Sequence, residues 1–147
     1  MENIFSDEYF MKKALSEAQI AFEKGEIPVG AVVVAGNQVI SKSHNLTELL
    51  NDVTAHAEMQ SITAAANYLG GKYLKGCTIY VTLEPCQMCA GALYWSQIDR
   101  IVFGAGDSQR GFRAMDTKIH PKTEVKSGVL ESECSELMLR FFQEKRK

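Results

Sequence analysis

The residues of this chain best suited to chemistry fall in two short stretches, residues 56–58 (His-Ala-Glu) and residues 85–89 (Pro-Cys-Gln-Met-Cys). Two thiolates and one imidazole are ligands that zinc favours, whereas a closed structural zinc site has four protein ligands. Three protein ligands leave a coordination position for water, as a catalytic zinc requires. We therefore predict that His56, Cys86 and Cys89 bind one Zn²⁺ ion.

The pattern of these stretches resembles a known signature. His-x-Glu followed by Pro-Cys-x-x-Cys is typical of the zinc nucleobase deaminases, and the chain is similar to the cytidine-deaminase-like superfamily. Zinc lowers the pKa of water from about 15.7 to about 7 in favourable sites. Glu58 lies beside a ligand, so we expect it to take the proton of the attacking water and to return protons to the ring nitrogen and the leaving amine. The expected reaction is hydrolytic deamination.

The spacing also constrains the geometry of the site. Cys86 and Cys89 are three residues apart in the first turn of an expected helix, where they share one side and the helix dipole favours thiolate. His56 is expected to open a second helix, with the two N-termini facing each other across the metal. Because His56 and Glu58 do not share a face within a helix, the site must lie off the helix end.

Two other interpretations of the cysteines are less well supported. A Cys-x-x-Cys pair can be a redox centre, but the upstream His-x-Glu and the strand before Pro85 disfavour that interpretation. A structural zinc site needs a fourth ligand. The candidates, none of which has ligand spacing to the others, are His44, His120, Cys77 and Cys134.

Hydrophobic periodicity predicts one domain, residues 1–147, in which helices and strands alternate. The expected elements are a helix from Ser6 or Asp7 to Gly25, a hairpin of residues 29–35 and 38–43, a helix over 55–68, a strand over 78–83, a helix from Pro85 to 97, strands over 100–104 and 124–126, and a closing helix from Glu131 or Ser132. Residues 44–53 and 105–123 are expected to be irregular. This order predicts a layered α/β domain, and the resemblance makes it the three-layer α/β/α cytidine-deaminase-like fold with a mixed five-stranded sheet and helices on both faces.

Composition and charge leave the partner open. The net charge is −2, which does not favour nucleic acid by itself. Cations nevertheless gather between residues 110 and 126, where they form either a phosphate-binding patch or a solvated loop. The polar start of the chain and the lack of an apolar run of about 20 residues predict no export signal and no membrane partner. Free thiols favour a cytoplasmic location. No DNA partner is expected.

A longer resemblance, to the bacterial tRNA adenosine deaminases, covers most of the chain. It is carried by residues 26–34 (EIPVGAVVV), 44–45 (HN), 54–58 (TAHAE), 80–86 (YVTLEPC), 88–92 (MCAGA), 102–105 (VFGA) and the last helix. It implies conversion of the wobble adenosine in a tRNA anticodon loop to inosine by a homodimer. It also implies that Asn45 hydrogen-bonds the target base and that Val29 walls the pocket. Asp107 would lie near the flanking nucleotides, with Phe142 packed close by.

Three features depart from that family and leave the substrate open. Val53 replaces a common proline, residues 110–113 (Arg-Gly-Phe-Arg) replace a stretch of small residues, and residues 94–95 (Tyr-Trp) resemble the guanine deaminases. The alternative substrate is therefore guanine or a cytosine-type base or nucleoside. A third hypothesis is a zinc-stabilised RNA-binding or scaffold module without catalysis. For Tyr94 and Trp95 we favour helix packing or a dimer contact over base binding.

Overall fold

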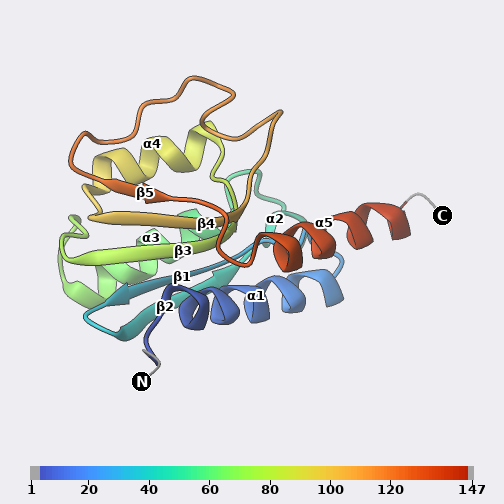
Figure 1. Ribbon diagram of the computed structural model, residues 1–147, viewed down its shortest axis with the longest axis horizontal. Helices are drawn as coiled ribbons and strands as arrows, with labels where there is room; N and C mark the ends of the chain where they lie inside the picture. The colour runs from blue at the N-terminus through green and yellow to red at the C-terminus, as the bar shows by residue number, and fades with distance from the viewer. Residues whose placement is uncertain (1–3, 146–147) are drawn as a thin grey trace.

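A mixed sheet of five strands forms the middle layer of the computed structural model, which describes residues 4–145 (Figure 1). The strand order is β2-β1-β3-β4-β5; β1 is antiparallel to β2 and β3, whereas β3, β4 and β5 are parallel. The strands are β1 (Gly30–Ala35), β2 (Gln38–His44), β3 (Cys77–Leu83), β4 (Arg100–Ala105) and β5 (Glu124–Lys126). The predicted strands and the predicted mixed sheet are confirmed.

Helices cover both faces of this sheet. On one face lie α1 (Asp7–Glu23) and α5 (Glu131–Lys145), and on the other lie α3 (Ala57–Leu69) and α4 (Gln87–Ser96). Val33 packs toward α3 and α4, whereas its neighbour Val32 packs toward α1, because successive strand side chains point to opposite faces. This explains why β1 is apolar at every position. The predicted α/β/α layering is thus confirmed.

Close packing of α1 fixes the start of β1. The hydroxyl of Ser6 caps α1 by accepting the N–H of Tyr9 at 3.2 Å. The helix then crosses β1 at Gly30, where an added Cβ would lie 2.1 Å from the carbonyl oxygen of Ala14. Only glycine allows this approach, so Gly30 sets how closely α1 packs on the strand that Val29 precedes.

Two predicted details of the region before α3 were wrong. The helix predicted over 55–68 begins at Ala57, because the N–H and hydroxyl of Thr54 bind the Asp52 carboxylate instead of capping the helix. The segment 44–53 also contains a one-turn helix, α2 (Thr47–Leu50). Its N–H groups at Glu48 and Leu49 donate to the buried carboxylate of Glu26, at 3.0 and 2.8 Å. Within residues 4–145, no helix combines the length and apolar character needed to cross a membrane.

Candidate functional site

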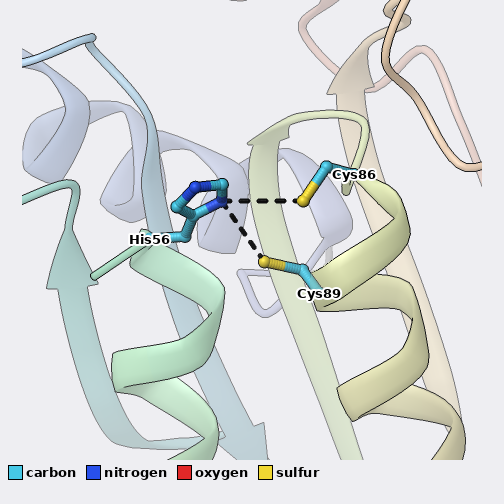
Figure 2. Close-up of side chains that lie close together, drawn as sticks. All are labelled: His56, Cys86 and Cys89. Carbon is cyan, nitrogen blue, oxygen red and sulfur yellow. Dashed lines mark hydrogen bonds between the residues drawn. The ribbon is translucent and has the colours of Figure 1, made fainter. Parts of the chain in front are cut away.

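Three predicted ligands come together at the ends of two helices (Figure 2). Nδ1 of His56 lies 3.6 Å from Sγ of Cys86 and 3.5 Å from Sγ of Cys89. One ligand atom from each residue lies within 4.8 Å of the others. In the part of the chain that the structure describes, no fourth His, Cys, Asp or Glu joins this group. The group could hold a metal ion through three protein ligands, and its two sulfurs and one imidazole nitrogen suit a soft divalent metal.

Backbone conformation explains how these side chains converge. His56 is the N-cap residue of α3 and Cys86 is the N-cap residue of α4, and both have extended backbones. Their side chains therefore leave the helix ends, while Cys89 lies in the first turn of α4. Contrary to the expectation, the two helix N-termini do not face each other across the ligand group. Figure 2 shows α3 and α4 running side by side away from the site, because both pack on the same face of the sheet.

The three groups perturb one another's pKa values. Hydrogen bonds with Cys89 and His56 lower the pKa of the Cys86 thiol to about 4, and the bond with Cys86 raises the pKa of His56. The contact with Cys86, together with burial, raises the pKa of Cys89. The thiolate form of Cys86 and the protonated form of His56 thus favour each other. Metal binding needs deprotonated ligands, so it would oppose the raised pKa values of His56 and Cys89.

Glu58 completes the chemistry of the site. The residue is 4% exposed, and burial raises the pKa of its carboxyl to about 7 even though His56 lies nearby. A carboxyl whose pKa lies near neutrality can both accept and release a proton during turnover. Glu58 therefore stands beside the ligand group with the properties of a proton carrier.

A cavity of about 550 Å³ joins Glu58, His56 and Cys86 to the predicted substrate-binding residues. All four of those residues line it: Val29, Asn45, Asp107 and Phe142. Asn45 is only 6% exposed, yet its side-chain amide makes no hydrogen bond with any described residue, so it is available to a ligand. Asp107 has a role that the resemblance did not imply. Its Oδ1 accepts the N–H groups of Gln109 and Arg110, each at 3.0 Å, and so shapes the loop at the cavity mouth.

Glu84 is a site residue whose role the sequence did not indicate. Its carboxylate, with a side chain 1% exposed, accepts four N–H groups. Oε1 binds the Asp107 amide and Nη2 of Arg113, and Oε2 binds the amide and Nε of Arg113. Burial favours a higher pKa for Glu84, but the Arg113 and backbone N–H groups outweigh it and lower that pKa.

The same carboxylate explains a nearby glycine. A Cβ on Gly111 would lie 2.3 Å from the carboxyl carbon of Glu84, so a side chain there would displace the carboxylate from the loop N–H groups that it accepts. The next amide, at Phe112, donates to the carbonyl of Pro85 at 2.8 Å. The loop after β4 is thus fastened to the segment that carries Cys86.

Other chemically suited residues lie outside the site. Neither Tyr94 nor Trp95 lines the cavity: the Tyr94 ring packs against His120, and Trp95 is 77% exposed. His44 pairs with Glu17 at 3.0 Å, away from the ligand group. Among the described residues, neither cysteine outside the Cys-x-x-Cys pair joins the group either.

A His/Cys/Cys ligand group beside a buried carboxylate, on an α/β/α domain, defines a deaminase of the cytidine-deaminase-like fold. The family model of the MafB19-like deaminases matches residues 5–146. A tRNA-specific adenosine deaminase of Bacillus subtilis is 46% identical over 147 residues, which cover 96% of this chain and 91% of that protein.

Two solved structures are also similar. One, from a study of A-to-I editing by tRNA:A34 deaminases at the wobble position of transfer RNA, is 44% identical with a TM-score of 0.82 and covers 88% of this chain and 98% of its own. A guanine deaminase of Bacillus subtilis is 33% identical with a TM-score of 0.67, over 78% of this chain and 71% of that one. The chain belongs to the family of tRNA-specific adenosine deaminases.

Proposed function

We propose that this protein, acting through one deaminase domain of residues 1–147, hydrolyses the wobble adenosine of a tRNA anticodon to inosine and releases ammonia. One observation carries the proposal. A three-ligand group and the buried Glu58 share a cavity, in a chain 46% identical to a tRNA-specific adenosine deaminase. The 33% identity to a guanine deaminase supports guanine as the second candidate substrate.

The proposed mechanism assigns His56, Cys86 and Cys89 as ligands of one zinc ion in each subunit. When bound, zinc would make a water molecule acidic enough to give up a proton near neutral pH and so become a nucleophile toward the target base. Glu58 takes a proton from the attacking water and donates it to the ring nitrogen of adenine. Glu58 then passes the second proton to the exocyclic amine, which leaves as ammonia while C6 becomes a carbonyl carbon. Burial suits Glu58 to both transfers, because it brings the pKa of the carboxyl to about 7.

The remaining cavity residues position the base. The free amide of Asn45 hydrogen-bonds the edge of the adenine, and Val29 forms an apolar wall. Phe142, at the mouth, packs beside a flanking nucleotide, and the loop shaped by Asp107 borders the strand. A single-stranded anticodon loop suits this cavity, since its base can be turned out at lower cost than a base in a duplex.

We further propose that the protein works as a homodimer in the cytoplasm. Exposed apolar side chains near the C-terminal ends of α3 and α4, among them Tyr68 and Trp95, offer surface for a second copy. None of the four cysteines forms a disulfide, which suits a reducing compartment. Sedimentation analysis of the purified protein checks the dimer.

A substrate panel tests the proposed function. The zinc-loaded protein is incubated separately with an anticodon stem-loop RNA containing the wobble adenosine, with guanine and with cytidine, and released ammonia is measured. We expect ammonia and inosine from the RNA alone. Ammonia from guanine without inosine in the RNA would assign the protein to the second candidate.

A further inference from the structure

The loop after β4 carries two arginines in opposite situations. The Arg113 side chain is partly exposed but paired: Nε and Nη2 donate to Glu84, and the guanidinium lies 5.0 Å from the centre of the Phe103 ring. Arg110 turns outward, lines the mouth of the cavity and is exposed. Within residues 4–145, its guanidinium makes no ion pair or hydrogen bond. One arginine therefore builds the loop, and the other is free to bind a ligand.

Charge makes this free guanidinium significant. The residues that line the cavity include three carboxylates, Glu58, Glu84 and Asp107, and Arg110 is the one Arg or Lys among the described lining residues. Arg113 neutralises Glu84, and the chain as a whole carries −2. A phosphate that reaches this mouth would meet negative charge if Arg110 were absent, whereas a neutral free base would not be repelled.

We propose that Arg110 binds a backbone phosphate next to the target nucleotide and thereby makes the enzyme prefer RNA to a free base. The inference rests on the proposed function. A guanidinium donates two parallel hydrogen bonds to a phosphate. The loop that carries it is already ordered, because Glu84 holds the loop and Asp107 accepts the Arg110 amide at 3.0 Å. The entropic cost of ordering the loop backbone when phosphate binds is therefore small.

The experiment compares wild type, Arg110→Gln and Arg110→Lys on the anticodon stem-loop at several salt concentrations. Lys72→Gln is the control, because Lys72 follows the far end of α3, about 20 Å from the site. For Arg110→Gln we expect KM to rise about tenfold at low salt, with a much smaller change in kcat. The slope of log(kcat/KM) against log[salt] should become shallower by about 0.7. Arg110→Lys should restore most of the slope, and Lys72→Gln should match wild type.

A second arm identifies the phosphate. Stem-loops carrying a neutral methylphosphonate at one flanking linkage are assayed with wild type and with Arg110→Gln. At one linkage, the methylphosphonate should lower the kcat/KM of wild type by as much as the Arg110→Gln substitution lowers it on normal RNA. The same methylphosphonate should not lower the kcat/KM of Arg110→Gln any further. Unchanged KM and salt slope in Arg110→Gln, with inosine still formed by wild type, would overturn this inference and leave the proposed function standing. If wild type forms no inosine in RNA, both fall.

Discussion

Replacing Glu84 by Gln should loosen the loop that borders the cavity. The substitution keeps the shape of the side chain but turns one oxygen into an NH₂ donor. Each oxygen accepts one backbone N–H and one Arg113 guanidinium N–H. Either orientation of the new amide therefore leaves one backbone N–H and one guanidinium N–H without an acceptor. An unsatisfied buried amide costs about 1–3 kcal/mol. Losing the acceptor of the guanidinium N–H costs less than about 1 kcal/mol, because the Arg113 side chain is 56% exposed and can turn to water.

The expected loss is therefore about 1–4 kcal/mol of unfolding free energy, or roughly 3–15 °C in Tm. Urea unfolding at a fixed zinc concentration measures it. Glu124→Gln is the matched control, because Glu124 is 67% exposed with one ion pair and should cost less than about 0.5 kcal/mol. The native pKa of Glu84 lies below its unfolded value of about 4.3. Its stabilisation is thus present above that pH and lost as the pH falls through the native pKa.

Two results would refute this reasoning. One is a Glu84→Gln protein as stable at pH 7 as the Glu124→Gln control. The other is a stability difference from wild type that stays the same when the pH is lowered through the native pKa of Glu84.

Two further predictions address the metal group and the opposite end of the sheet. Cys89→Ser should bind well under one zinc per chain by elemental analysis, because one of three ligands is lost, whereas Cys134→Ser should keep its zinc; equal zinc contents would contradict the ligand assignment. Asp7→Asn should lose about 2 kcal/mol at pH 7, because hydrogen bonds from Arg100 hold the pKa of Asp7 well below its usual range and Tyr80 also donates to it. This stabilisation is complete above the unfolded pKa of about 3.9 and declines at lower pH, so a difference in urea unfolding that persists at strongly acidic pH would count against it.

Local patterns predicted the strands, most of the helices and the proximity of His56, Cys86 and Cys89. The β-branched run before Gly36 and the turn that follows it specify the hairpin, and the Pro-Cys-x-x-Cys stretch after β3 places two thiols at a helix N-terminus. These signals lie within a few residues of one another. The convergence of His56 with the cysteines was predicted from their types, because an imidazole and two thiolates are ligands that zinc favours.

Contacts between distant segments were beyond local patterns. Glu84 meets Arg113 across 29 positions, and Glu26 caps α2 across 22, and neither carboxylate differs in type or spacing from a solvated one. The sequence likewise predicted a basic stretch after β4 without separating Arg113, which builds the loop, from Arg110, which faces the cavity. Only the packing of the loop on Glu84 distinguishes them.

The central claim is that Glu58 moves protons for a hydrolysis carried out at the three-ligand group. Mass spectrometry of an anticodon stem-loop, after incubation with wild type or Glu58→Ala at equal measured zinc content, tests it most directly. The account predicts inosine with wild type, and a rate lower by at least about 10²–10⁴-fold with the zinc-loaded variant. A Glu58→Ala protein that forms inosine at the wild-type rate would contradict it.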